Sequence, residues 1–496
     1  MKTIITKSAI CVILATFLSG GLNAQTYPDY LFGTTSPQTM NAMIRQYSPT
    51  EAVSVHYNYR TPPNTSYSTI SVVDISGNIK SLDMEPGYEV YDMEITSDYL
   101  IMCGRYNSSD AFIGCVYIPN ISTSSATVYY HTYSDISYFS KMVAYKNLNG
   151  DIKVLAVGEI IYSSQYPALI DGGSCSGIQY YFDPCGSSYM CGMNLIVEVT
   201  NPQTTPMGGL PFDVTFIEDI NSPGFIDDVV LTDNYVVFVG QGSVGGNPAL
   251  LLYRRNRNNT PNVLSNFGNY YYFNLPISEH AGFYIGCHME GDTIAVTIRG
   301  SFLDTGWSKY DTRIRVIDAA SMVMTSSQAF DLNGYKADPQ DLVYLPQSHT
   351  LVLLEDIVYP AGAGVNNFSF IFLNPYQKFK DNPGGMPIIT PPLPWVLPYT
   401  AKGFHESNWG LTFWSMDRIV NGNAILSTGG DYWMIKSIPL ITSNHSCYKP
   451  VSVDIYKLYD VIGVLGYNNH PDCSLTFTSH SVVHSPVASS VRITCF

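Results

Sequence analysis

The chain has 496 residues, of which 45% are hydrophobic, 13% aromatic and only 13% charged, and its formal net charge is −15. This many aromatic and this few charged residues exclude a disordered chain, and the composition is not that of a coiled coil or helical bundle. The acidic balance leaves no phosphate-neutralising surface, so we expect no nucleic-acid partner.

Residues 1–24 have the pattern of a secretory signal peptide. Lys2 and Lys7 form a positive start, residues 9–18 an apolar core, and Ala24 a small residue at the cleavage point. An apolar core of roughly ten residues is too short for a bilayer, which needs about twenty, so we expect no transmembrane segment. The mature chain, starting at Gln25, is expected to be secreted, periplasmic or on the cell surface.

Cysteines are the next feature, since nine of them follow the leader. In an oxidising compartment some should pair, and an odd number leaves at least one free or bound to another chain. Cys175, Cys185 and Cys191 lie in a Gly/Ser-rich insertion, residues 171–192, and we expect at least one disulfide among them. A zinc site would need a fourth ligand and a Cys-x-x-Cys spacing, which this insertion lacks.

After the leader, short apolar and β-branched runs follow one another between Gly, Pro, Asn and Asp residues, which is typical of an all-β chain. Three such strands are predicted around Tyr57 and over residues 70–75 and 79–84. From residue 87 onward a small residue followed by an aromatic one recurs just before an apolar strand. The seven steps are Gly87-Tyr88, Ser137-Tyr138, Gly224-Phe225, Gly282-Phe283, Gly334-Tyr335, Gly403-Phe404 and Gly466-Tyr467.

A second strand follows each step and ends in Gly in most units, and third strands and weaker fourth strands come after it. Four short antiparallel strands repeated about seven times resemble a β-propeller, in which each blade covers the face of the next. The resemblance is to seven-bladed architectures of the WD40/YVTN-like or quinoprotein-like kind. The spacing of about 63 residues exceeds the roughly 40 to 50 of WD40 and kelch repeats, and neither of their signatures is present, so no particular family is indicated.

We therefore predict one all-β domain over residues 25–496, a seven-bladed propeller of four-stranded antiparallel blades. The three strands near Tyr57 lack a first strand, and residues 474–479 look like a first strand without a unit. Joining them would close the ring and remove exposed sheet edges. A pair of β-sandwiches would also explain the strands, but not the recurring Gly-aromatic step.

Long loops are expected on one face, where second-to-third connections and connections between blades meet. The expected second-to-third loops include residues 105–111, 159–193, 301–312 and 356–367. Long loops on a rigid scaffold are where binding is usually built. A Pro-rich loop, residues 374–398, is expected to lie over the sixth blade. Aromatic and acidic residues gather in the loops of this face, and the candidate ligand-binding residues are Tyr106, Glu159, Asp304, Trp307, Tyr310, Asp356, His405, Glu406 and Trp409.

Flat aromatic rings beside carboxylates suit sugars and suit protein hot spots equally well. Three histidines in equivalent loops, His280, His405 and His470, make a metal site conceivable, but loop histidines are more often solvated, so we predict no metal and no cofactor. Ser301 to Trp307 is similar to the Asp-box turn of sialidase-like propellers, but its spacing differs and it occurs once where those enzymes carry several copies, so we assign it no such role.

Signatures of a nucleophile elbow, a zinc protease or a P-loop are absent. The sequence therefore favours a non-enzymatic protein that binds a protein or glycan through the long-loop face. The alternative is a carbohydrate-active hydrolase or lyase that uses loop carboxylates on the same face, which would need two acids about 5 to 10 Å apart.

Overall fold

The computed structural model describes twenty-four segments of the chain, which contain the elements discussed below. They are residues 30–33, 38–59, 66–74, 78–121, 125–134, 138–161, 192–204, 213–217, 225–244, 247–258, 269–274, 283–299, 312–331, 336–346, 349–358, 367–373, 399–400, 414–418, 424–428, 432–438, 454–457, 462–466, 473–474 and 478–485. The leader, the Cys-containing insertion and the Pro-rich loop lie outside these residues.

The described strands form seven antiparallel sheets of four or five strands each. The strands of each sheet are given from the inner strand outward. Sheet I contains β2 (Gln38–Ser48), β3 (Glu51–Tyr59), β4 (Tyr67–Asp74) and β5 (Ile79–Asp83). Sheet II contains β6 (Tyr88–Thr96), β7 (Tyr99–Tyr106), β8 (Asp110–Tyr117), β9 (Ala126–Tyr133) and β32 (Thr478–His484), and sheet III contains β10 (Tyr138–Lys146), β11 (Ile152–Ile161), β12 (Gly192–Thr200), β13 (Asp213–Ile217) and β31 (Cys473–Ser474).

Sheets IV to VII follow the same order along the chain. Sheet IV contains β14 (Phe225–Leu231), β15 (Tyr235–Val244), β16 (Asn247–Asn256), β17 (Asn269–Asn274) and β30 (Ile462–Gly466), and sheet V contains β18 (Phe283–His288), β19 (Thr293–Arg299), β20 (Thr312–Asp318), β21 (Val323–Asp331) and β29 (Asp454–Lys457). Sheet VI contains β22 (Lys336–Leu345), β23 (Thr350–Val358), β24 (Asn367–Leu373) and β25 (Tyr399–Thr400). Sheet VII contains β26 (Trp414–Arg418), β27 (Ala424–Thr428), β28 (Tyr432–Ile438) and β1 (Tyr30–Gly33).

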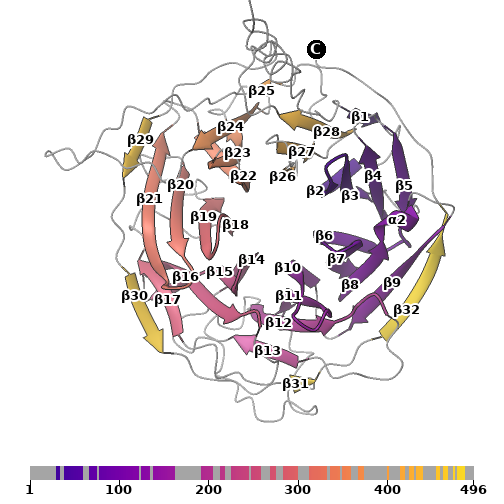
Figure 1. The fold of residues 1–496 in the computed structure, drawn as a ribbon, viewed down its shortest axis with the longest axis horizontal. Coiled ribbons are helices and arrows are strands. Elements are labelled where there is room, and N and C mark those ends of the chain that lie inside the picture. The colour runs from indigo at the N-terminus through magenta and orange to yellow at the C-terminus, as the bar shows by residue number, and fades with distance from the viewer. Residues whose placement is uncertain are drawn as a thin grey trace, which may run out of the picture.

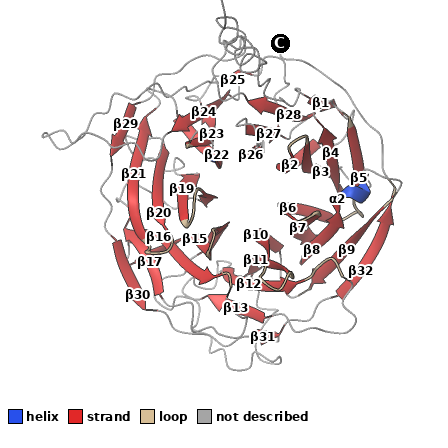
Figure 2. Ribbon diagram, viewed as in Figure 1, coloured by secondary structure: helices blue, strands red, loops and turns tan. Residues whose placement is uncertain are grey.

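The seven sheets lie around a common centre (Figure 1). Inner strands of successive sheets contact one another in the order β2, β6, β10, β14, β18, β22 and β26, and β26 contacts β2 again. Strands dominate the described part of the chain, with the short helix α2 (Ile118–Ile121) beside β5 (Figure 2). The expected all-β, antiparallel class is confirmed, and the sheets do not form two packed sandwiches.

Sheets I to V pack face to face on one another in sequence, so the middle strands of sheets II to IV are buried on both sides. Strand β4 is buried at all six of its interior positions, and its polar members Ser68, Thr69 and Ser71 have hydrogen-bond partners there. Between sheets I and II the core includes Val72, Leu100 and Phe112, all buried. Equivalent apolar cores separate sheets II and III, III and IV, and IV and V. Neighbouring sheets therefore supply the face that one sheet cannot bury alone.

The Gly-aromatic step marks the start of an inner strand at four positions: β6, β10, β14 and β18 begin at Tyr88, Tyr138, Phe225 and Phe283. The step at Tyr335 comes one residue before β22. The step at Gly466 was misassigned, because Gly466 ends β30, an outer strand. The step at Gly403 lies outside the described residues.

The predicted pairing of the N- and C-terminal strands is wrong in its details. Residues 38–48 form β2, so sheet I already has its own first strand, and residues 478–484 of β32 pair instead with β9 at the outer edge of sheet II. The N-terminal strand β1 pairs with β28 of sheet VII. Polar residues interrupt β2 and no Gly-aromatic step precedes it, so its sequence gave no strand signal.

The last four described strands lie along the outside of the sheets. Strands β29, β30, β31 and β32, which we call the outer belt, add a fifth strand to sheets V, IV, III and II in that order. Figure 1 shows these strands in yellow at the periphery. Each belt strand covers a sheet edge that would otherwise be open to pairing with another chain. In the described residues no helix is long and apolar enough to cross a membrane.

Candidate functional site

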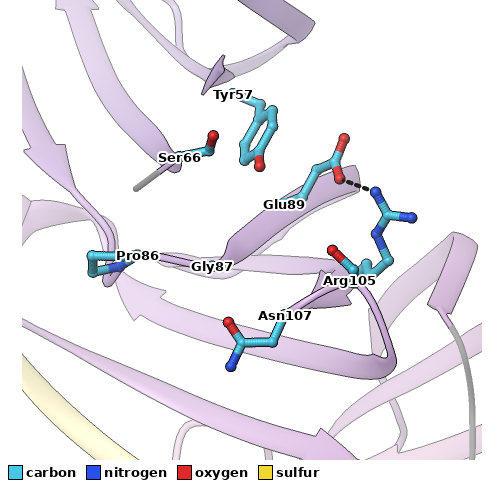
Figure 3. Close-up of a pocket in the computed structure, with 8 residues that line it drawn as sticks. Tyr57, Ser66, Pro86, Gly87, Glu89, Arg105 and Asn107 are labelled. Carbon is cyan, nitrogen blue, oxygen red and sulfur yellow. Dashed lines mark hydrogen bonds and ion pairs between the residues drawn. The ribbon is translucent and has the colours of Figure 1, made fainter. Parts of the chain in front are cut away.

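One face of the sheets collects two kinds of connection. In each antiparallel sheet the first strand begins at this face, the second strand returns to it, and the fourth strand returns to it again. The connection from the second to the third strand and the link to the next sheet therefore both lie at this face. The link before β6 and the β7–β8 turn meet there, beside the ends of β3 and β4. A pocket of about 290 Å³ opens at this junction of sheets I and II (Figure 3). Its lining residues are Tyr57, Ser66, Pro86, Gly87, Glu89, Arg105, Asn107 and Ser108.

Gly87 fixes the backbone at the base of this pocket. Its φ of +92° is the left-handed region that glycine adopts most easily. Its N–H donates to the carbonyl of Ser66 at 2.9 Å, and its own carbonyl accepts from the N–H of Asn107 at 3.0 Å. A Cβ here would collide with the Asn107 side-chain amide. Gly87 thus ties β4 of sheet I to the β7–β8 turn of sheet II.

The β7–β8 connection is short, although residues 105–111 were expected to form a long loop. Tyr106 pairs with Asp110, so only three residues turn the chain. Asn107 and Ser108 take φ values of 48° and 68°, in the left-handed region that Asn tolerates better than most residues. The turn therefore presents the Asn107 amide, both a donor and an acceptor, to the pocket (Figure 3).

An ion pair joins the two strands that form one side of the pocket. A guanidinium nitrogen of Arg105 on β7 lies 2.7 Å from a carboxylate oxygen of Glu89 on β6 (Figure 3). The Tyr91 hydroxyl donates to the same oxygen at 3.1 Å. Burial opposes the charged form of Arg105, but the hydrogen bond to Glu89 holds the pKa of that guanidinium above its usual value. Burial raises the pKa of Tyr91, so its hydroxyl stays protonated as a donor.

The Glu89–Arg105 ion pair lies where the backbones of β6 and β7 come close together. Gly104 faces Val90 across β6 and β7, and a Cβ at position 104 would overlap the carbonyl oxygen of Glu89. Glycine at 104 is needed for this approach. With Tyr57 as a flat ring, the pocket offers a balanced charge pair, an amide and hydroxyls, a set that both donates and accepts hydrogen bonds.

Of the nine predicted ligand-binding residues, Tyr106 has a described side chain. It is half-buried, and its ring stacks on Tyr88 with centroids 4.3 Å apart. It lies between the pocket residues Arg105 and Asn107 along the chain. Its role as a ligand contact stays a prediction.

Two further candidates lie on strands and not in loops. Glu159 is in β11, opposite Tyr138 and Asn194, and Asp356 is in β23, opposite Asp338 and Phe368. The described second and third strands are linked through residues 162–191, 300–311 and 359–366, which lie outside the described residues. Asp304, Trp307, Tyr310, His405, Glu406 and Trp409 lie outside the described residues.

The pocket residues Tyr57, Glu89, Arg105 and Asn107 were not predicted from sequence. Glu89 and Arg105 belong to one hairpin, so opposite charges on neighbouring strands were a usable signal. The pairing itself depends on a β-bulge between Val90 and Asp92, which shifts the register by one residue.

A second charged cluster lies on the inner strands. Lys141 on β10 is 3.9 Å from Asp228 on β14, and Arg45 on β2 is 3.7 Å from Asp92 on β6. Burial disfavours the charged form of Lys141, but Asp228, Asp92 and Asp341 outweigh this and raise its pKa. Burial raises the pKa of Asp228, which Lys141 partly offsets. Within the described residues no group of three or more His, Cys, Asp or Glu side chains could hold a metal ion.

No protein-family model matches the chain, and no curated protein matches it. Among solved structures it is similar to acylaminoacyl peptidase from Pyrococcus horikoshii, at 10% identity over 83% of this chain and 53% of that one, with a TM-score of 0.37. The chain thus spans about half the length of that peptidase.

Two other solved structures are similar over almost their whole length. The β-propeller domain of the trilobed protease from Pyrococcus furiosus is 7% identical over 83% of this chain and 98% of its own, with a TM-score of 0.38. A protein of unknown function from Dyadobacter fermentans is 8% identical over 84% and 99%, with a TM-score of 0.41.

Proposed function

We propose that this chain is an exported, non-enzymatic β-propeller that binds a glycan or protein ligand through the face that carries its long connections. In this proposal residues 1–24 are removed, residues 25–496 form one domain, and the seven sheets are the blades of a closed ring. The cycle of inner-strand contacts from β2 through β26 and back to β2 supports the closed ring.

The observation that carries the binding proposal is the pocket between sheets I and II. It lies on the face with the long connections, and it combines the Tyr57 ring with the Glu89–Arg105 pair and the Asn107 amide. Sugar hydroxyls both donate and accept hydrogen bonds, and a carboxylate paired with a guanidinium offers one partner of each kind. An aromatic ring adds an apolar face. Among the two ligand classes, this chemistry favours a glycan with uncharged hydroxyl-rich residues.

The test is a glycan array combined with a pull-down, using the mature protein. Tyr57→Ala and Asn107→Ala should each weaken binding of a glycan found with the parent by about tenfold or more, the loss expected for a contact at the centre of a site. Leu148→Ala is the matched control, because Leu148 is exposed in the β10–β11 turn on the opposite face. Equal binding by all three variants would place the ligand elsewhere.

The same experiment addresses catalysis. Among the pocket's lining residues Glu89 is the one carboxylate, and it is held by Arg105, whereas a glycosidase needs a pair of acids. Appearance of shortened products from a bound glycan would assign the chain to the carbohydrate-active enzymes instead. N-terminal sequencing of the exported protein tests the leader, since the mature chain should start at Gln25.

A further inference from the structure

Strand β32 ends the outer belt on the sheet that carries the pocket. All seven of its residues pair with β9, from Thr478 opposite Thr132 to His484 opposite Ala126. None of its side chains is fully buried, and Val483 is 67% exposed. The strand is therefore held by the backbone ladder, by a few polar side chains and by Val482, which packs against the core between sheets I and II.

His484 of β32 contacts the Tyr130 hydroxyl through its Nε2 atom at 3.3 Å. His480 contacts Glu85, which directly precedes the pocket residue Pro86. Its Nε2 atom lies 3.1 Å from a carboxylate oxygen of Glu85 and 3.4 Å from the Tyr88 hydroxyl. Its ring also stacks on Tyr130, with centroids 5.1 Å apart and planes 22° apart. The imidazole thus contacts Glu85 and Tyr88, which lie nearly 400 positions earlier in the chain, and Tyr130 on the neighbouring strand β9.

Glu85 is followed directly by Pro86 and Gly87, which we call the pocket wall. The segment is tied on its other side to sheet I, where the N–H groups of Met84 and Gly87 donate to Ser68 and Ser66 at 2.8 and 2.9 Å. Glu85 donates its N–H to the Tyr130 hydroxyl at 3.4 Å. His480 therefore holds the outer end of the segment that forms the pocket wall.

The same imidazole begins a stack of rings that leads to the pocket. Tyr130 stacks on Tyr88 and Tyr88 on Tyr106, with centroids 4.3 Å apart in both pairs. Tyr106 precedes Asn107, whose N–H is bonded to Gly87. Both sides of the pocket base, the wall and the β7–β8 turn, are thus connected to His480.

We propose that His480 is a positioning residue for the pocket, so that the C-terminal strand fixes the pocket wall through Glu85 and the tyrosine stack. The proposal extends the binding function proposed above, because it is this pocket that His480 shapes. The geometry of the wall is nevertheless measurable without any ligand, since the amides of Gly87 and Asn107 report on it directly.

The experiment is hydrogen–deuterium exchange of the mature protein and three variants. In His480→Ala the amides of Gly87 and Asn107 should exchange about tenfold faster, because the wall opens locally once its outer contact is lost. His480→Gln should restore protection, since its amide can still donate to Glu85. Ser481→Ala is the control, because Ser481 is an exposed neighbour on the same strand.

The amides of residues 126–133 distinguish positioning from simple attachment of the strand. They should stay protected in every variant if β32 remains paired with β9. The proposal is overturned if His480→Ala leaves Gly87 and Asn107 unchanged, if His480→Gln exchanges as fast as the Ala variant, or if residues 126–133 lose protection together with them. Absence of any glycan or protein ligand would contradict the proposed function and leave these exchange rates as they are.

Discussion

Asp92 on β6 accepts a hydrogen bond from the backbone N–H of Met142 on β10, at 2.9 Å, across the junction of sheets II and III. Its other carboxylate oxygen accepts from the N–H of Met93 at 3.0 Å. Asp228 repeats the arrangement two junctions further, between sheets IV and V, where it accepts from the N–H groups of Gly286 at 2.7 Å and Val229 at 2.9 Å. A β-bulge precedes each Asp on its strand. The inner strands of these sheets are therefore fastened by a repeated carboxylate clasp.

Replacing Asp92 or Asp228 by Asn should destabilise the fold by about 2 kcal/mol, measured as the free energy of unfolding in urea. Both carboxylate oxygens accept from backbone N–H groups, whereas an amide can accept at only one side and would turn its NH₂ toward the other donor. Both side chains are buried, so water cannot replace the lost partner.

The control for these variants is Asp233→Asn. Asp233 is exposed in the turn after β14, on the same sheet as Asp228, and its replacement should change stability by less than about 0.5 kcal/mol. Equal effects of the three substitutions would mean that the hydrogen bonds of Asp92 and Asp228 to the backbone add nothing to the free energy of unfolding beyond the change of charge.

A buried ion triad joins sheets III and IV. Glu198 on β12 lies 3.0 Å from the Lys153 ammonium and 2.6 Å from the Arg255 guanidinium, and it is 8% exposed. Glu198→Ala should lower the free energy of unfolding by about 3 to 5 kcal/mol, because two cations then lose their shared counter-charge in a desolvated site.

Removing the whole triad should cost less than removing its centre. The triple variant Lys153→Met, Glu198→Met and Arg255→Met leaves no unpaired charge and is expected to be more stable than Glu198→Ala. Urea unfolding of both variants checks this. A triple variant less stable than the single one would show that the triad stabilises the fold by more than mutual neutralisation.

His56 should make stability fall in mild acid. Burial lowers the pKa of His56 to about 3, whereas an unfolded histidine titrates near 6.5. The neutral ring is favoured in the fold, so its contribution is complete above about pH 7 and is lost as pH falls from 6.5 toward 3. Between pH 8 and pH 5 the loss from this residue is about 2 kcal/mol. The measurement is the free energy of unfolding at both pH values in the parent and in His56→Leu.

The Leu variant should show a smaller fall, since the other titrating groups are common to both proteins. A parent and a variant that lose the same stability on acidification would mean that His56 does not set this dependence.

The strands were largely predictable because their signals are local. Tyr88, Tyr138, Phe225 and Phe283 begin inner strands as expected, since a Gly or Ser turn before an apolar run marks a strand start wherever it lies. The same pattern cannot tell an inner strand from an outer one, so Gly466 was assigned to the wrong kind of strand. The outer belt depends on contacts between distant segments, which no local pattern shows.

The pocket was not predictable for a related reason. Counting back from the pair of Thr96 and Tyr99, an unbroken hairpin would set Glu89 opposite Tyr106. The bulge after Val90 sets it opposite Arg105 instead. Sequence reasoning chose only aromatic and acidic residues and His405 of the expected loops. Within residues 105–111 it therefore selected Tyr106 and did not select Asn107, whose amide lines the pocket.

The outer belt leads to a last prediction about the end of the chain. A protein that ends at Ser474 lacks β32 but keeps four strands in every described sheet, so its β-sheet signal in circular dichroism should persist. The free energy of unfolding should fall by about 2 to 4 kcal/mol, through loss of the β9 ladder and of the His131–Ser479 hydrogen bond of 2.8 Å.

The uncovered edge of β9 should then drive self-association, because an open edge strand presents unpaired N–H and C=O groups to a second chain. Sedimentation velocity over a range of concentrations measures this, and a protein that ends at Ser485, which keeps β32, is the matched control. Complete unfolding of the shorter protein would mean that β32 is required to form sheet II. A monomer with the stability of the control would mean that β32 neither stabilises the sheet nor protects its edge.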